Sequence, residues 1–419
     1  MKRNYVIVWM IMFSFFVISF ITNILGPIIP QATIDLHLSL AKAGILPFAF
    51  FIAYLISIPA GYALEKYGSK FVIILAFVIG VVGSLIFSIH PNYETYLITL
   101  FIIGICVAIL QVAFWPLLRT AGGEENYSFN SVLTQIFFGI ASFISPLVYS
   151  YLVLNLPQNA HNNIFLLVMS KLVPVNFSWV SIYWLNALIM ICMILLIGII
   201  RFPEVELIDS EKLEGFKTVL QLLKNKIIII YFFGIFSYVG MEQGISVWIS
   251  KFLQDYHGFD ANTTGAHAVA LFWAMQCVGS LLGIILLKIF DVKKILAVFL
   301  ILQIIALSVA LFGRASWSLV SFPICGFLTS VMYGSVFSLG MNSLKTNHGT
   351  VSGILCTGII GGAIVPMLVG VLGNITNLRF GMCLVYATII FMLYISLTAK
   401  PLVNNKTIKL NELFRKSDK

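Results

Sequence analysis

The sequence predicts an all-α membrane protein in which twelve transmembrane helices form two pseudo-symmetric six-helix halves. Three observations predict this fold. Of the 419 residues, 60% are apolar and only 10% are charged, whereas about 25% of the residues in a soluble domain are charged. The apolar residues fall into twelve long segments, and one strongly charged connection separates the first six from the last six. This composition excludes a water-soluble enzyme of the same size.

The first half is predicted from six apolar segments, each near the roughly 20 residues that a helix needs to cross a bilayer. They cover residues 6–30, 43–64, 71–89, 96–118, 129–153 and 178–200. The first segment follows Lys2 and Arg3. It is too long for the core of a signal peptide and lacks a small-residue cleavage site, so we expect it to be retained as the first helix.

The second half has six further segments, near residues 227–249, 265–288, 295–312, 317–340, 350–372 and 379–398. Between the halves lies RFPEVELIDSEKLEGFKTVLQLLKNK, in which ten of 26 residues are charged. We therefore predict an N-terminal half over residues 1–200 and a C-terminal half over residues 227–400. A cytoplasmic linker over 201–226 joins them, and a cytoplasmic tail follows over 401–419.

The distribution of Lys and Arg predicts which side of the membrane each loop occupies. If both termini are cytoplasmic, twenty of the 25 Lys and Arg residues lie on that side and five lie on the other. The net charge of +9 then reflects topology and does not indicate a nucleic-acid partner. We predict a multi-pass protein of the cell membrane, surrounded by the lipid bilayer, with both termini in the cytoplasm.

One acidic residue lies well inside a predicted helix. Of the 16 Asp and Glu residues, Glu242 is the one that falls within an apolar segment away from its ends. A carboxylate in hydrocarbon costs roughly 3 kcal/mol or more, so such a group normally faces a cavity or a partner. We expect Glu242 to line a substrate cavity, and it is the candidate for proton coupling. The alternative is a structural partner for a nearby tyrosine or amide.

The connection after the second segment reads GYALEKYGSK and resembles the signature loop of the major facilitator superfamily, G-x-x-x-D-R-x-G-R-R. The matching residues are Gly61, Glu65, Lys66, Gly68 and Lys70. Two positions depart from the pattern, because Glu65 replaces Asp and Ser69 takes a basic position. The resemblance implies the major facilitator fold, with these residues and Arg119 in gating or structural roles. An ordinary positive-inside loop is the alternative.

A narrower resemblance rests on NILGPIIPQ in the first segment, LQVAFWPLLRTAGG in the fourth, YVGMEQG around Glu242, and GGAIVP from Gly361 to Pro366. These stretches are similar to the fucose, galactose and glucose permeases, the hexose:cation symporter branch of the superfamily. The resemblance implies secondary active or facilitative transport of a monosaccharide, such as glucose, galactose or fucose, by alternating access.

The chain also departs from that branch, which typically has an Asp in the first helix, an acid in the fourth and an Asn in the fifth. Here those places hold Gly26, Gln111 and Phe138, although Gln135 is retained. Two titratable groups that the branch links with proton coupling are therefore absent. The coupling ion stays open between H⁺ and Na⁺, with uniport as the third option.

A sugar needs several hydrogen-bonding side chains and an aromatic plane against its apolar face. Side chains four residues apart share one side of a helix, as Gln111 and Trp115 do. The substrate-binding candidates are Asn23, Gln111, Trp115, Gln135, Tyr238, Glu242, Gln243, Trp273, Gln276 and Tyr333. For an isolated Asn or Gln, an interhelical hydrogen bond is the alternative. Trp179, Trp248 and Trp317 lie near segment ends and are predicted to be interfacial belt residues.

The sequence contains no HExxH, GxSxG, P-loop or glycine-rich dinucleotide motif, so it predicts no enzyme activity, cofactor or nucleotide-driven pumping. The six cysteines lie inside apolar segments without CxxC spacing and indicate neither a metal site nor a disulfide framework. We expect a monomer. The alternative function on the same fold is export of amphipathic or drug-like molecules, which would need a larger and more aromatic cavity.

Overall fold

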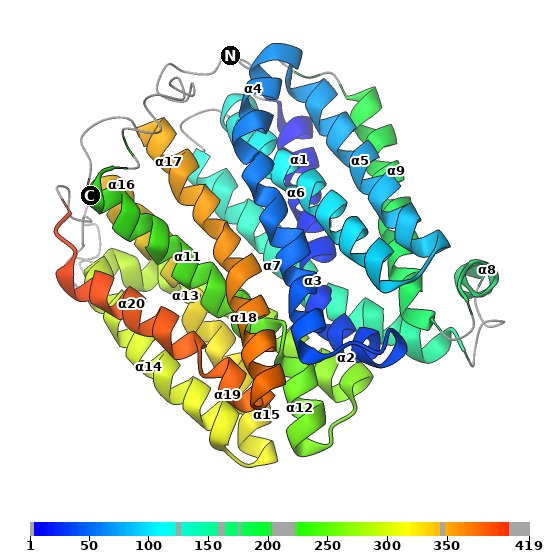
Figure 1. The fold of residues 1–419 in the computed structure, drawn as a ribbon. Coiled ribbons are helices and arrows are strands. Elements are labelled where there is room, and N and C mark those ends of the chain that lie inside the picture. The colour runs from blue at the N-terminus through cyan, green and yellow to red at the C-terminus, as the bar shows by residue number, and fades with distance from the viewer. Residues whose placement is uncertain are drawn as a thin grey trace, which may run out of the picture.

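Helices make up nearly all of the described part of the chain (Figure 1). The computed structural model describes residues 4–122, 127–157, 164–174, 177–200, 202, 222, 224–343 and 348–401. Nearly all of the predicted cytoplasmic linker and tail lies outside these ranges.

The first half contains α1 Tyr5–Thr22, α2 Leu25–Asp35, α3 Leu40–Ile52, η1 Ala53–Ile56, α4 Ser57–Tyr67, α5 Ser69–Ile89, α6 Tyr93–Gly122, α7 Tyr127–Asn155, α8 Ile164–Leu172, η4 Ser178–Val180 and α9 Ser181–Ile199. The second half contains α11 Lys226–Ser246, α12 Ile249–His257, η5 Ala261–Gly265, α13 Ala266–Ile289, α14 Val292–Phe312, α15 Ala315–Thr329, α16 Met332–Asn342, α17 His348–Thr357, η6 Gly358–Ile360, α18 Gly361–Ile375, α19 Leu378–Met382 and α20 Val385–Thr398.

The predicted membrane class is confirmed. Within the described residues, 11 helical segments are long and apolar enough to cross a membrane, and a shorter apolar helix covers Leu40–Ile56. The shorter helix lies in the predicted second segment, where a 3₁₀ turn at Ala53–Ile56 interrupts the α-helix and the continuation α4 carries charged residues. Together these segments account for the twelve predicted crossings.

Several predicted helices are interrupted, which the hydropathy pattern did not indicate. The first segment breaks between α1 and α2 at Asn23 and Ile24, and the seventh breaks between α11 and α12 at Val247 and Trp248. The tenth breaks between α15 and α16 at Ser330 and Val331. A break inside a membrane protein leaves backbone groups that neighbouring protein must satisfy. The predicted loop between the fifth and sixth segments contains the short helix α8.

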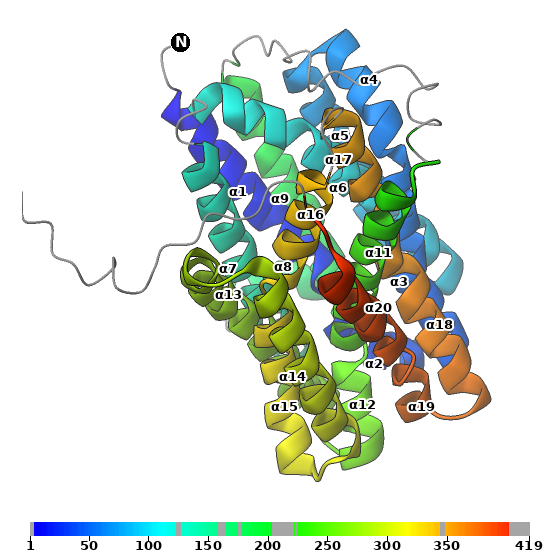
Figure 2. The ribbon, with the colours of Figure 1, turned by 90° about the vertical axis from the view of Figure 1, so that its left-hand side faces the viewer.

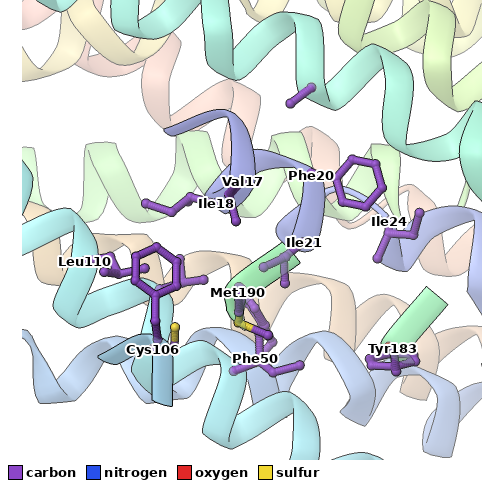
Figure 3. Close-up of a cluster of buried hydrophobic side chains, with 14 of the residues drawn as sticks. Val17, Ile18, Phe20, Ile21, Ile24, Phe50, Cys106, Leu110, Tyr183 and Met190 are labelled. Atoms are coloured by element: carbon purple, nitrogen blue, oxygen red, sulfur yellow. The ribbon is translucent and has the colours of Figure 1, made fainter. Parts of the chain in front are cut away.

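Buried apolar side chains form two large clusters. One is formed mainly by residues between Ile7 and Ile197, and the other mainly by residues between Ile228 and Ala399. Figure 3 shows part of the first cluster, where Cys106 of α6 and Met190 of α9 meet. Gly80 of α5 packs against both. A Cβ atom there would lie 2.5 Å from the Met190 sulfur and 2.8 Å from the Cys106 sulfur. Glycine therefore permits the close approach of three helices.

Two tryptophans do not lie where the sequence predicted them. Trp317 is 63% exposed, as an interfacial residue would be, but Trp179 and Trp248 are at most 1% exposed. The Trp248 indole donates to the Pro366 carbonyl at 3.2 Å, and the Trp179 indole donates to the Asp35 carboxylate at 2.8 Å. The interfacial interpretation of these two residues is wrong, because each indole has a hydrogen-bond acceptor inside the protein.

The two halves pack along α3 beside α18 and along α7 beside α13 (Figure 1 and Figure 2). We call the end of the molecule with the last turns of α2, α12 and α18 the α12 end, and the opposite end, with the last turn of α4, the α4 end. At the α12 end, α2 also contacts α12 and η5. Gly370 of α18 faces Gly44 of α3, and a Cβ atom on Gly370 would lie 2.5 Å from the Leu40 carbonyl oxygen. Glycines thus bring the halves close together here.

Candidate functional site

The C-terminal half places an acid and two neutral side chains in mutual contact. Tyr238 and Glu242 are four residues apart on α11 and so share one side of that helix. The Tyr238 hydroxyl donates to Glu242 Oε1 at 2.6 Å. Gln276 of α13 also donates to Glu242 Oε1, and to the Tyr238 hydroxyl at 3.1 Å. Three of the predicted site residues therefore meet in one hydrogen-bonded group.

A second aromatic residue of the C-terminal half extends this group. Tyr333 of α16 packs edge-on against Tyr238, with ring centroids 5.5 Å apart and an interplanar angle of 60°. Phe337 stacks on Tyr333 from one turn further along the helix, at 5.9 Å and 20°. The Tyr333 hydroxyl lies beside the Cys356 thiol. The predicted candidate Tyr333 thus joins the acid through an aromatic contact.

The N-terminal half contributes a neutral pair. Gln111 of α6 donates to the Tyr54 hydroxyl of η1 at 3.1 Å. Tyr54 is 4% exposed and packs against Phe51, with ring centroids 6.0 Å apart. Tyr54 also lies near Cys356 and Tyr333 of the other half. We refer to Tyr54, Gln111, Tyr238, Glu242, Gln276 and Tyr333 as the central polar cluster.

Tyr54 is a member of the central polar cluster that the sequence interpretation missed. It lies in the apolar run AFFIAYLIS, where a hydroxyl needs a partner for the same reason that a carboxylate does. That signal was available, although a tyrosine gives a weaker indication than an acid because its ring is itself apolar. Cys356, which the sequence interpretation did not single out, is partly buried and lies next to the cluster.

The cluster combines one carboxylate with groups that cannot neutralise it. The phenol and the carboxamide that donate to Glu242 are both neutral, and Gln243, which is 6% exposed, adds a third neutral donor. Glu242 and Gln276 are only partly buried, so part of each side chain is free to contact a ligand. The arrangement can accept hydroxyl donors, donate from amides, and hold a proton on one carboxyl group.

Three of the predicted binding residues have other surroundings. Asn23 donates to the Ser19 and Ser142 hydroxyls at 3.2 and 2.9 Å, which joins α1 to α7 within the N-terminal half. Trp115 packs against Phe15 with ring centroids 4.9 Å apart. Gln135 is exposed on α7. For Asn23, this geometry favours the interhelical hydrogen bond that was the alternative to a ligand contact.

Trp273 lies one turn from Gln276 on the same side of α13. Its side chain is 4% exposed, and its indole nitrogen has no hydrogen-bond partner among the described residues. A buried indole N–H usually finds a partner, so this donor is available to a ligand that reaches it.

One residue of the signature loop, Lys70, caps the end of a helix. Lys70 Nζ donates to the carbonyl oxygens of Gly198 and Ile200, both at 2.8 Å, and thereby caps the end of α9. Gly68 has a φ of 80° between α4 and α5, a conformation that glycine adopts at no steric cost. Lys66 Nζ lies over the Tyr67 ring at 5.1 Å. Gly61 lies within α4, and the side chains of Glu65 and Arg119 lie outside the described part of the structure.

Two helical halves with a polar cluster between them form the architecture of a secondary transporter. The sequence model of the Major Facilitator Superfamily matches residues 11–366, and the chain belongs to this superfamily. The resemblance noted in the sequence is therefore confirmed.

Relatives of known name agree with the narrower resemblance. The chain is 30% identical over 372 residues to the glucose/galactose transporter of Brucella abortus, with 86% of each chain covered. It is 26% identical over 424 aligned positions to the L-fucose-proton symporter of Escherichia coli, with 95% of each chain covered.

Solved structures share the fold at lower identity. The crystal structure of the Escherichia coli fucose:proton symporter matches with a TM-score of 0.67 at 22% identity, covering 95% of this chain and 100% of that one. A bacterial homologue of the human lysosomal transporter Spinster matches with a TM-score of 0.78 at 15% identity, covering 94% and 97%. Both likenesses concern the fold alone.

Proposed function

We propose that the protein transports a monosaccharide across the membrane by alternating access, with the two halves moving around the central polar cluster. The observation that carries this proposal is the cluster itself, in which Tyr54 and Gln111 of the N-terminal half lie near the phenols, the amide and the carboxyl group of the C-terminal half. The relatives named for glucose, galactose and fucose transport support a hexose as the substrate.

The chemistry of the cluster suits a sugar. Gln111 and Gln276 offer amide donors and acceptors for hydroxyl groups, and Glu242 offers acceptor oxygens. Tyr333 offers an aromatic face near these polar atoms, which suits the apolar C–H face of a pyranose. A purely hydrophobic substrate would use none of the hydrogen-bonding capacity that the carboxyl group and the amides keep beyond their contacts with one another.

Glu242 is the proposed site of proton coupling. Its donors are neutral, so a proton arriving on the carboxyl group changes the charge of the cluster by a full unit. Such a change can alter how the acid binds Tyr238, Gln276 or a sugar hydroxyl, because a protonated carboxyl group also donates. Uniport, or coupling to Na⁺ through amide and backbone oxygens, would make this proton unnecessary.

The proposed orientation follows from charge. The predicted cytoplasmic loops carry twenty of the 25 Lys and Arg residues, and the loop after α4 belongs to them. We therefore assign the α4 end and both termini to the cytoplasm and the α12 end to the outside.

The test is counterflow of labelled glucose, galactose and fucose in proteoliposomes, followed by uptake under an imposed pH gradient, with and without Na⁺. Counterflow of at least one hexose is expected. Accumulation that disappears when the pH gradient collapses would support proton coupling, and accumulation that follows Na⁺ would replace it. Absence of counterflow with every hexose would contradict the sugar assignment and leave export of amphipathic compounds as the alternative.

A further inference from the structure

We propose that Asn262 is the latch that holds the two halves together at the α12 end, and that rupture of its two hydrogen bonds opens this end. Asn262 Nδ2 donates to Gln31 Oε1 of α2 at 3.2 Å. Asn262 Oδ1 accepts from the Tyr149 hydroxyl of α7 at 3.0 Å. Both partners belong to the N-terminal half, whereas Asn262 belongs to the C-terminal half. One amide therefore joins two helices of the opposite half.

The local structure holds Asn262 in a fixed position. It lies in η5, a single π-helical turn between α12 and α13, and such turns are frequent at functional sites. Asp260 Oδ1 accepts from both the backbone N–H and the hydroxyl of Thr263, each at 2.8 Å. The Ser250 hydroxyl of α12 donates to the Ala261 carbonyl at 3.0 Å. Hydrogen bonds from Ser250 and to Asp260 thus hold the turn in place, and this fixes the backbone from which the Asn262 side chain projects.

The N-terminal half fixes the direction of its own amide. Asp35 accepts at both oxygens, from the Trp179 indole at 2.8 Å and from Gln31 Nε2 at 2.9 Å. A carboxylate only accepts hydrogen bonds, so the Gln31 amide must turn its nitrogen to Asp35 and its oxygen to Asn262. Trp179 is held by close packing against Phe87, with ring centroids 5.2 Å apart. The charge of Asp35 therefore determines which group donates and which accepts in the series of hydrogen bonds from Trp179 through Asp35 and Gln31 to Asn262.

This order of donors and acceptors predicts which substitution breaks the latch. In Asn262→Asp the new carboxylate would face the Gln31 oxygen, and rotating the Gln31 amide would only turn that oxygen toward Asp35. Neither orientation of the Gln31 amide gives a hydrogen-bond donor to both carboxylates, at position 35 and at position 262. In the double variant Asp35→Asn/Asn262→Asp the order of donors is reversed: the amide introduced at position 35 donates to the Gln31 oxygen, and the Gln31 nitrogen donates to the carboxylate at position 262. Every group in this series of hydrogen bonds then has a partner again.

The experiment measures opening directly. Ile29 of α2 is fully buried and packs with the apolar cluster of the C-terminal half, so an Ile29→Cys reporter becomes accessible when the α12 end separates. The full chain in lipid nanodiscs is treated with a membrane-impermeant maleimide, and mass spectrometry quantifies labelling at position 29. Loss of the hydrogen bond to Gln31, together with repulsion between the new carboxylate and the Gln31 oxygen, predicts labelling about tenfold faster in Asn262→Asp. Labelling in Asp35→Asn/Asn262→Asp should return to within about twofold of the parent.

Asn377→Asp is the matched control, because it adds the same charge at the same end. Asn377 Oδ1 accepts from the Phe380 N–H at 3.1 Å and from the Tyr256 hydroxyl at 3.2 Å, and a carboxylate keeps both roles. Its labelling should equal that of the parent. Tyr149→Phe removes one of the two latch bonds and should accelerate labelling about threefold, which keeps the test available if Asn262→Asp does not fold.

Three results would overturn the latch. They are unchanged labelling in both Asn262→Asp and Tyr149→Phe, equal acceleration in Asn377→Asp, and failure of the double variant to restore protection. The measurement needs no substrate, so its outcome is independent of whether the protein carries a hexose.

Discussion

Lys70 in the N-terminal half and Lys293 in the C-terminal half occupy the same place, the second residue of a helix. Lys70 of α5 donates to two carbonyls at the end of α9. Lys293 of α14 donates to the Ala399 carbonyl just after α20, at 3.2 Å. The two halves thus use the same device to tie the end of their last helix, where a cation is favoured by the helix dipole.

The halves differ at the central polar cluster. The N-terminal half contributes Gln111 and Tyr54, an amide and a phenol, whereas the C-terminal half contributes the acid Glu242. The scaffold is repeated, but the carboxyl group is present on one side only. A change in protonation would therefore alter the contacts of the C-terminal half directly and leave the Gln111–Tyr54 pair as a constant part of the site.

The most severe test of this asymmetry is Glu242→Gln. A gradient of one pH unit is worth 1.36 kcal/mol per proton and can drive roughly tenfold accumulation at one proton per sugar. We expect Glu242→Gln to lose this accumulation completely, because the amide cannot carry the proton, while counterflow of hexose stays within about threefold of the parent. Uptake and counterflow in proteoliposomes at several pH values measure both. Persistent accumulation in Glu242→Gln would remove the acid from the coupling mechanism.

The second test concerns the boundary along α3 and α18, where Gly44 of one half faces Gly370 of the other. Leucine at Gly370 would place a Cβ atom 2.5 Å from the Leu40 carbonyl oxygen, and leucine at Gly44 would place one 3.0 Å from the Met367 carbonyl oxygen. We expect either substitution to slow hexose transport by about tenfold or more, with Gly370→Leu the more severe, since the backbones must separate.

Gly198→Leu on α9 is the control for the glycine substitutions, because a Cβ atom there would meet nothing within 4 Å. Its transport rate should match that of the parent. Equal loss in Gly198→Leu would show that the added bulk acts through general destabilisation. Normal transport in both Gly44→Leu and Gly370→Leu would mean that close contact at the α12 end is not needed in the cycle.

The third test compares the two amides of the cluster. Gln111→Leu and Gln276→Leu each remove one hydrogen-bonding group, so each should raise KM for the hexose by about tenfold. Of these two amides, Gln276 is the one that contacts the acid. We therefore expect the pH profile of transport to shift in Gln276→Leu and to stay in place in Gln111→Leu. Equal pH shifts in the two variants would contradict the assignment of charge to one half.

Hydropathy predicted the membrane helices well because each must present about 20 apolar residues to lipid, and it singled out Glu242 because a carboxylate among such residues is conspicuous. It could not predict that Trp179 and Trp248 are buried, since a tryptophan near a helix end looks the same whether it faces a lipid headgroup or a carbonyl. The break at Val247 and Trp248 was likewise hidden, because both residues are apolar. Tyr54 was missed because its ring hides its hydroxyl in an apolar run.

The partner of each amide also depends on how helices pack, which composition does not encode. Asn23 and Gln276 look alike in sequence, as single amides in apolar segments, yet Asn23 joins two serines of its own half and Gln276 meets the acid. Only the arrangement of the helices separates the two cases.

The smallest expected effect concerns the shared device. Lys70 makes two hydrogen bonds of 2.8 Å, whereas Lys293 makes one of 3.2 Å. Both side chains are partly exposed, so each bond is worth only about 1 kcal/mol. We expect Lys70→Met to lower the melting temperature by a few degrees and Lys293→Met to lower it by less, measured by thermal unfolding in detergent. Neither should change the pH profile of transport, since neither lysine is part of the central polar cluster. A larger loss in Lys293→Met would mean that the carbonyl cap of the C-terminal half is the stronger of the two, and the repeat would then be unequal in its scaffold as well as in its charge.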